Sequence, residues 1–271
     1  MTGFSISWLD LREPADVKAR SKLLAQEAIV WLENNSNGFD NILVDLGSGT
    51  GSTLRTLTTL GARNIIWRLV DNDGQLLDEA LKRHSKHLLI EAYQADLTLI
   101  EELPFGGAKL VTASALFDLV SREFLDSLLE TLSSQKTALY AALNYDGNIE
   151  WTPSHPLDAA VLKAFNQDQR KDKGFGKALG PDATEYLQQI LESKNYKIST
   201  ASSPWQLNAT NYELVSELIE GIVGAVENDY GLIASDLTAW KEFRIAHASS
   251  GTCNLGHLDL LALPLQPKIL L

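Results

Sequence analysis

Short apolar stretches alternate with helical patterns along most of this chain. Seven stretches have the length and the predominantly apolar character of buried strands, at 42–46, 65–70, 88–93, 110–113, 137–143, 196–200 and 258–263. Helical periodicity follows three of them, at 53–60, 74–87 and 121–133. Apolar strands of this kind are typical of parallel sheets covered on both faces and joined by right-handed crossovers. The pattern predicts an α/β fold with a doubly wound, seven-stranded, mostly parallel sheet.

Other helical patterns lie outside this alternation and are expected to cover the sheet. One helix is predicted over 14–34, because Pro14 suits a first helical turn and the NNSNG run ends the apolar stripe. Further helices are predicted at 156–167, 181–194, 212–226 and 237–248. Only one of these falls in 145–180, and a connection of that length is usually functional or disordered. We therefore expect helical and loop insertions that cover a functional site.

Composition and charge exclude several classes of protein. Apolar residues make up 45% of the 271 residues, and no stretch approaches the ~18 apolar residues of a membrane helix. The single cysteine, Cys253, excludes an internal disulfide. The net charge is −12, and acidic residues interrupt the densest basic run, 170–177, so the clustered Lys and Arg that bind nucleic acid are missing. We expect no nucleic-acid partner and no membrane contact, and the absence of a secretory pattern in 1–10 predicts a cytoplasmic protein.

The strongest functional signal is the sequence DLGSGTG at 45–51, which follows a predicted strand and begins a helix. Glycines in such a loop let the backbone turn tightly and approach a ligand closely. A dinucleotide-binding G-x-G-x-x-G motif would place its third glycine where Ser52 stands. The spacing D-x-G-x-G-x-G instead resembles the first motif of class I methyltransferases, and the resemblance covers about 41–142. It implies S-adenosylmethionine as the cofactor, with the methionine arm against the glycines.

A second acid supports this interpretation. Asp71 ends the second predicted strand, twenty residues after Gly51, where a carboxylate can accept hydrogen bonds from both ribose hydroxyls. The alternative is that Asp71 caps the following helix, a role that Asp73 fits at least as well.

The resemblance implies further cofactor contacts. Asp96 and Leu97 match the positions that meet the adenine amino group and a ring nitrogen, although Asp96 is also a common residue type at the start of a loop. Ser114 follows the fourth strand, in a segment that lines the methyl-transfer site in the family. Arg12 and Arg20 are candidates for the cofactor's carboxylate, with Arg20 preferred, unless they form surface ion pairs. The expected cofactor-binding set is Arg20, Asp45, Gly47, Ser48, Gly49, Gly51, Asp71, Asn72, Asp96, Leu97 and Ser114.

The acceptor is expected over the carboxyl ends of the fourth and fifth strands. Methyl transfer from a sulfonium mainly requires alignment of donor and nucleophile, and a general base only when the acceptor must lose a proton. His155 is the best base candidate and Tyr145 can orient the acceptor, although His155 also fits a loop residue that bonds the backbone. The segment 165–177 is interpreted as a lid hinged at glycines or as an exposed, solvated loop. The expected substrate-binding set is Phe117, Asn144, Tyr145, Asn166 and Arg170.

The sequence is thus interpreted as a single methyltransferase-like domain over 1–271. Its expected parts are a helical cap (1–40), a cofactor-binding core (41–143), a substrate or lid insertion (144–180) and a sheet edge with a helical insertion (181–271). No metal is expected, although Asp118 and Asp146 leave a Mg²⁺ site as a minor alternative. The predicted activity is methyl transfer to O, N or C of a small polar molecule. A protein side-chain methyltransferase, a non-catalytic S-adenosylmethionine-binding module and an NAD- or flavin-dependent oxidoreductase remain alternatives.

Overall fold

The computed structural model describes residues 4–35 and 41–265, and an eight-stranded sheet runs through it. The strands are β1 (Asn41–Leu46), β2 (Ile65–Asp71), β3 (Leu89–Gln94), β4 (Ala108–Ser114), β5 (Ala138–Thr152), β6 (Tyr196–Ser202), β7 (Trp205–Leu207) and β8 (Thr252–Pro264). Their order is β3-β2-β1-β4-β5-β8-β6. In this order β8 runs in the opposite direction to the other strands. The predicted doubly wound, mostly parallel sheet of seven strands is confirmed, and the short β7, which was not predicted, pairs with β8.

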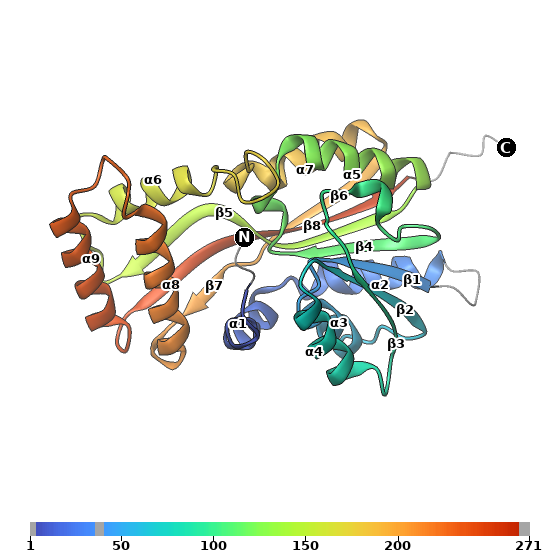
Figure 1. Ribbon diagram of the computed structural model, residues 1–271, viewed down its shortest axis with the longest axis horizontal. Coiled ribbons are helices and arrows are strands. Elements are labelled where there is room, and N and C mark those ends of the chain that lie inside the picture. Colours follow the sequence, from blue (N-terminus) through green and yellow to red (C-terminus); the bar gives the residue numbers. More distant parts are fainter. Residues whose placement is uncertain (1–3, 36–40, 266–271) are drawn as a thin grey trace.

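Helices cover both faces of this sheet (Figure 1). One face packs against α5 (Arg122–Gln135) and α7 (Ala183–Ser193), the other against α2 (Lys22–Asn34), α3 (Ser52–Thr59) and α4 (Gly74–His84). The apolar run 42–44 of β1 is buried on both faces, because Val44 lies in the core on the α5 side and Leu43 in the core on the α2 side. Short 3₁₀ turns complete the connections, as η1 (Ile100–Glu102), η2 (Phe117–Leu119), η3 (Gly180–Asp182) and η4 (Ala209–Asn211).

The N-terminal segment forms two helices, so the single helix predicted over 14–34 is wrong. Helix α1 (Ile6–Ala19) begins at the N-cap Ser5 and contains Pro14 in its interior. The chain then leaves helical geometry at Arg20, and the Ser21 hydroxyl accepts a hydrogen bond from the Leu24 N–H to cap α2. The prediction took Pro14 as a residue of the first helical turn. It thereby overlooked the N-cap residues Ser5 and Ser21, which are stronger signals for the start of a helix.

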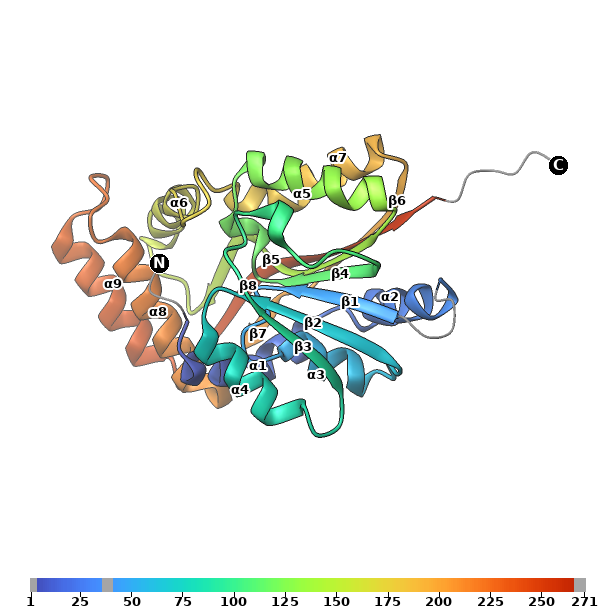
Figure 2. The same ribbon diagram turned by 45° about the vertical axis from the view of Figure 1, so that its right-hand side comes forward.

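Strands β5 and β8 continue past the sheet into a helical extension (Figures 1 and 2). The extension contains α6 (Asp158–Asp168), α8 (Tyr212–Val226) and α9 (Ala234–His247), which pack with the outer halves of the two strands around a third apolar core. The prediction that the fifth strand ends at 143 is wrong. Polar and apolar residues alternate over 144–152, and the apolar Ile149 packs in the third core, which is typical of a strand buried on one face.

The last strand, predicted over 258–263, is also too short, because β8 begins at Thr252. The remaining predicted elements lie within a few residues of the observed ones, and the helix predicted over 212–226 coincides with α8. In the part of the chain that the structure describes, no helix is long and apolar enough to cross a membrane.

Candidate functional site

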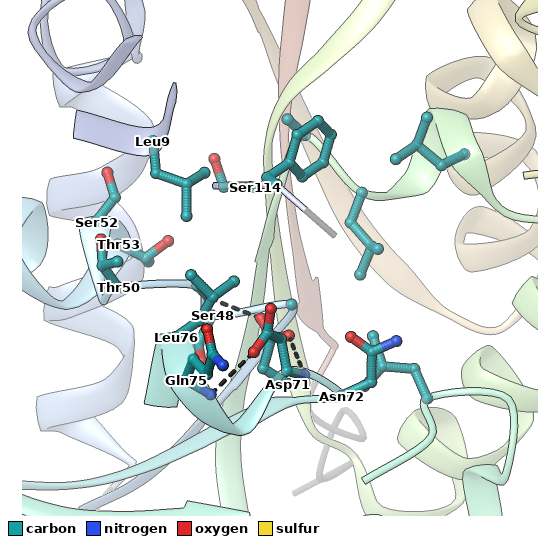
Figure 3. Close-up of a pocket in the computed structure, with 18 of the residues that line it drawn as sticks. Leu9, Ser48, Thr50, Ser52, Thr53, Asp71, Asn72, Gln75, Leu76 and Ser114 are labelled. Atoms are coloured by element: carbon teal, nitrogen blue, oxygen red, sulfur yellow. Dashed lines mark hydrogen bonds between the residues drawn. The ribbon is translucent and has the colours of Figure 1, made fainter. Parts of the chain in front are cut away.

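A cavity of about 800 Å³ lies at the carboxyl ends of the parallel strands, where ligands bind in open α/β sheets. Its wall is formed by α1, the β1–α3 loop, the β2–α4 turn, the segment after β3, the end of β4 and residues 174–175. Figure 3 shows Leu9 and Ser114 on one side of it and Asp71, Asn72 and Gln75 on the other. The volume falls within the range of about 300–1,000 Å³ that is usual for small-molecule sites.

The glycine loop presents bare backbone to this cavity. Gly47, Gly49 and Gly51 have φ values of 61°, 53° and 87°, a region that residues with a Cβ rarely adopt. A Cβ on Gly49 would lie only 3.1 Å from Leu9 Cδ1 of α1, so the loop and the helix approach each other closely. Gly47 and Gly49 line the cavity, whereas Gly51 forms the N-cap of α3 outside the lining.

Asp71 lies at the end of β2 with its carboxylate at the cavity wall. Its Oδ2 accepts a hydrogen bond from the Gly49 N–H at 2.8 Å and its Oδ1 accepts one from the Asp73 N–H at 3.0 Å. Burial raises the pKa of this carboxyl, which is 8% exposed. Asp73 caps α4 by accepting from the Gln75 N–H, so the capping role belongs to Asp73. Asp71 therefore fixes the glycine loop while keeping acceptor capacity at the cavity.

Three more of the expected cofactor contacts line the same cavity. Asp96 and Leu97 lie in its wall after β3, and Ser114 lies there at the end of β4. The Asp96 Oδ1 accepts hydrogen bonds from the Thr98 hydroxyl and N–H, which lower the pKa of Asp96. Ser48 and Asn72 also belong to the lining. The structure therefore brings most of the expected cofactor set together around one space.

Arg20 and Asp45 lie behind the cavity wall instead of in it. Arg20 is 3% exposed and donates from Nη2 to the Ser114 hydroxyl at 3.0 Å. Asp45 is 1% exposed and accepts from the Thr112 hydroxyl at 2.7 Å, and burial raises its pKa to about 7. Of the described basic residues, Arg12 is the one that lines the cavity. Helix α1 places Leu9, Arg12 and Asp16 on one face, and Arg12 forms the ion pair with Asp16 that was the alternative to a cofactor contact.

The expected substrate residues are not brought to this cavity. Phe117 is fully buried in the sheet core, and Asn144 is fully buried on β5. The Tyr145 hydroxyl donates to the Asn166 Oδ1 at 2.9 Å, and the Asn166 Nδ2 donates to a backbone carbonyl of β5, so this pair ties α6 to the strand. Arg170 pairs with Asp182 near the surface.

The two candidate catalytic residues also lie elsewhere. His155 packs against Phe243 in the helical extension, with ring centroids 4.9 Å apart, and its Nδ1 accepts from the Leu157 N–H. Tyr145 contacts Phe165 and His257, and burial raises the pKa of its hydroxyl. Neither residue lines the cavity, so this geometry gives no support to a general base at His155.

One part of the expected lid does reach the cavity. Gly174 and Phe175 line it, and the Asp172 carboxylate accepts hydrogen bonds from the N–H groups of Gly174 and Gly176. Phe175 packs edge-on against Phe124 of α5, with ring centroids 5.2 Å apart. Together with Leu116 and Leu119 after β4, Phe175 forms an apolar side of the cavity that the sequence did not identify.

Among the described residues, no group of three or more His, Cys, Asp or Glu side chains is placed to hold a metal ion. Asp118 is buried beside the fifth strand, and burial raises its pKa to about 6.

The strand order, the antiparallel β8, the glycine loop after β1 and the acid at the end of β2 occur together in one known architecture. The fold is that of class I methyltransferases.

Solved structures that are similar to this chain include methyltransferases of low sequence identity. The chain is similar to phosphoethanolamine N-methyltransferase 2 of Haemonchus contortus bound to S-adenosyl-L-methionine, with a TM-score of 0.46, 13% identity and coverage of 89% of this chain and 53% of that chain. It thus spans about half the length of that enzyme. An S-adenosylmethionine-dependent methyltransferase of Thiobacillus denitrificans has a TM-score of 0.46, 13% identity and coverage of 97% and 100%. Geranyl diphosphate C-methyltransferase of Streptomyces coelicolor has a TM-score of 0.46, 11% identity and coverage of 89% and 74%. No protein-family model and no curated protein sequence matches this chain.

Proposed function

We propose that this protein is a methyltransferase that binds S-adenosylmethionine in the cavity and methylates a small molecule. The observation that carries the proposal is the pairing of Asp71 with the glycine loop, which places a carboxylate beside bare backbone at the end of β2. The ribose hydroxyls would donate to Asp71 and the methionine arm would lie along Gly47 and Gly49. The adenine would lie beside Asp96 and Leu97, since within the described part of the chain both hydrogen bonds to the Asp96 carboxylate go to Oδ1.

The charge of the cavity wall favours this cofactor over a dinucleotide. Five carboxylates line the cavity, from Asp16, Asp71, Asp73, Asp78 and Asp96, whereas the basic residue Arg12 is already paired with Asp16. A pyrophosphate would be repelled by this wall, and a sulfonium cation would be attracted to it. This argument counts against the NAD- or flavin-dependent alternative.

The acceptor would enter on the side formed by Leu116, Leu119 and Phe175, next to Ser114 at the end of β4. The cavity volume of about 800 Å³ fits a cofactor together with a small acceptor, and Gly174 and Phe175 line the acceptor side. The chemistry would be transfer of the methyl group to an O, N or C atom of the acceptor, aligned by the cavity wall. In this proposal α1 closes one side of the cavity, residues 41–143 bind the cofactor, and of the expected insertion 144–180 only Gly174 and Phe175 contact the acceptor.

Calorimetric titration with S-adenosylmethionine, S-adenosylhomocysteine and NAD tests the proposal. We expect micromolar binding of both adenosyl ligands and none of NAD. Asp71→Ala should weaken the adenosyl ligands at least tenfold, because each hydrogen bond to a charged group contributes about 1.5–3 kcal/mol. Asp126→Asn, which removes an exposed carboxylate of α5 that accepts from Tyr186, is the matched control and should leave affinity unchanged. Tight NAD binding, or no adenosyl binding by the native protein, would contradict the proposal.

A further inference from the structure

One arginine side chain joins three elements beside the cavity. The Arg55 guanidinium of α3 donates from Nε and Nη2 to the two carboxylate oxygens of Glu13 on α1, both at 2.5 Å, and from Nη2 to the Thr50 hydroxyl at 3.2 Å. Its Nη1 donates to the Thr50 carbonyl at 2.5 Å and lies 2.9 Å from the Nε2 of His84 on α4. A guanidinium has five N–H donors and no acceptor, so His84 accepts through Nε2 and all five donors of Arg55 are used. We call these four residues the Arg55 junction.

The Arg55 junction holds the glycine loop from outside the cavity. Thr50 lines the cavity, and the other residues of the junction lie outside the lining. On the cavity side, the Asp71 carboxylate accepts from the N–H of Gly49, the residue before Thr50. The loop is therefore fixed at two successive residues, by Asp71 from the cavity side and by Arg55 from the opposite side.

Gly51 leaves the space in which the junction forms. Its φ is 87°, and a Cβ at this position would lie 3.4 Å from the His84 ring and 3.7 Å from the Arg55 Nη1. Any longer side chain would push the imidazole away from Arg55 and strain the backbone. Because Gly51 does not line the cavity, we assign the third glycine of the motif to the contact between the loop and α4.

The junction also holds α1, which forms one wall of the cavity. The buried residues of this helix are Ala15 and Asp16, so its position depends strongly on polar contacts. The side chains of Arg55 and Glu13 are 22% and 20% exposed, and an ion pair this far removed from water is stronger than one at the open surface. Loss of Arg55 would therefore release the glycine loop and the α1 wall together.

We propose that Arg55 is a positioning residue for the cofactor, which holds the glycine loop and α1 in the arrangement that binds an adenosyl ligand while His84 is neutral. The inference rests on the proposed function. Arg55 touches no ligand in this proposal, and it acts through Thr50 and Glu13.

The protonation state of His84 decides whether the junction is complete. The charged groups around its ring are Arg55 of α3, Glu13 of α1 and Arg83 of α4, and Arg83 is itself paired with Asp10. Burial, followed by the positive charges of Arg55 and Arg83, lowers the pKa of His84. The ring is therefore neutral at pH 7, whereas a protonated ring at acid pH would lose the bond from Arg55 and repel the guanidinium. Cofactor affinity should be complete above the pKa of His84 and decrease as the pH falls through it.

Arg55→Met tests the positioning role. By calorimetry at pH 7.5 we expect its affinity for S-adenosylhomocysteine to be lower by about tenfold or more, because the loop and α1 lose their common anchor. Arg55→Lys keeps the charge without the planar fork and should recover part of this loss. Arg63→Met is the matched control, because Arg63 donates to the Thr58 and Ala62 carbonyls at the end of α3, and it should leave the affinity unchanged.

Thermal unfolding of the same ligand-free variants identifies a purely structural role. If Arg55→Met lowers the unfolding temperature but binds S-adenosylhomocysteine with native affinity, Arg55 only stabilises the fold, and the proposal is overturned. If Arg55→Met does not fold, Arg55→Lys and the pH comparison below decide the question.

His84→Gln supplies the pH comparison. Glutamine can accept from Arg55 but does not ionise, so this variant should keep the junction at all pH values. Between pH 7.5 and pH 5.0 we expect the native protein to lose about threefold or more affinity for S-adenosylhomocysteine beyond what the variant loses. Groups such as Asp45 and Asp71 titrate in both proteins, so their contributions cancel in the comparison. An equal pH dependence in both proteins would overturn the role of His84.

Hydrogen exchange of the ligand-free protein separates this proposal from the proposed function. In Arg55→Met we expect faster exchange at the amides of 45–51 and of α1, and native exchange at β6 on the far edge of the sheet. If the native protein binds no adenosyl ligand, the proposed function fails, and the exchange pattern still decides whether Arg55 positions the loop and α1. Native protection of both segments in Arg55→Met would overturn the inference.

Discussion

Asp45 lies under the glycine loop, and its environment makes ionisation costly. Its side chain is 1% exposed, its Oδ1 accepts one hydrogen bond from Thr112, and its Oδ2 has no partner among the described residues. Burial is the main cause that raises its pKa to about 7. The folded protein therefore holds a proton on Asp45 at pH values where the unfolded chain has released it.

This difference predicts a pH-dependent effect of Asp45→Asn. Between about pH 4 and pH 7 the unfolded state binds fewer protons at this site than the folded state, so Asp45 lowers the free energy of unfolding as the pH rises. The amide cannot ionise and keeps an acceptor for Thr112. We expect Asp45→Asn to be close to neutral near pH 3.5 and to stabilise the fold by about 4 kcal/mol at pH 8, because each unit of pKa difference is worth about 1.4 kcal/mol. Thermal unfolding at both pH values measures this, and an equal effect at both would contradict it.

The sequence was enough to predict the structural role of some residues but not of others. Asp71 and Asp73 were separable, because a helix cap needs a residue next to the helix start and Asp73 lies there. The placement of His155 was not predictable, since it depends on α6 and α9 folding together at the far end of β5. Arg12 and Arg20 were both recognisable as candidates, but the sequence could not show which of them lines the cavity.

At the scale of elements, periodicity predicted the elements of the regular core but missed the break between α1 and α2 and the outer halves of β5 and β8. The strands of the sheet are recognisable because both of their faces are buried, and α8 because its apolar stripe is regular. The break at Arg20 was hidden, because a short interruption between two helices leaves little trace in an apolar pattern. The outer half of β5 was missed because its many polar residues are typical of a loop. Only the alternation of polar and apolar residues indicates a strand there.

A buried arginine joins the helices of the extension. Arg244 of α9 is 2% exposed and lies near the rings of Trp151 and Trp240, and it donates to the Asp158 carboxylate of α6 and to the Pro153 carbonyl. The Trp240 Nε1 also donates to Asp158. Asp158 is thus the shared acceptor of two buried donors.

We expect Asp158→Ala to destabilise the protein more than Arg244→Met. The first leaves a guanidinium and an indole N–H buried without their acceptor, at a cost of about 3 kcal/mol or more. The second leaves a carboxylate whose side chain is 23% exposed and retains much of the apolar packing. Urea unfolding of both variants gives the two free energies. The reverse order would show that the contacts of the guanidinium with the aromatic rings matter more than its charge.

At the scale of the whole molecule, one strand belongs to two cores. The inner half of β8 pairs with β6 and packs in the sheet core through Leu260. Its outer half pairs with β7 and packs in the core of the extension through Leu255. Strand β5 runs beside it through both regions.

This continuity predicts a single unfolding transition. Heat denaturation followed by far-UV circular dichroism and by tryptophan fluorescence should give coincident curves, because Trp67 reports on the sheet and Trp240 on the extension. An earlier fluorescence change would show that the extension unfolds by itself. Trp240→Phe assigns any such change to the extension.

The shared strand also limits how such a protein can be rebuilt. A helical extension joined by a linker can be exchanged as a cassette between scaffolds, but here the cut would pass through the backbone ladder of β5 and β8. A graft that carries the helical extension into another protein must therefore include both strands at full length. It must also preserve their register, since a slip of one residue would turn every side chain on them to the opposite face.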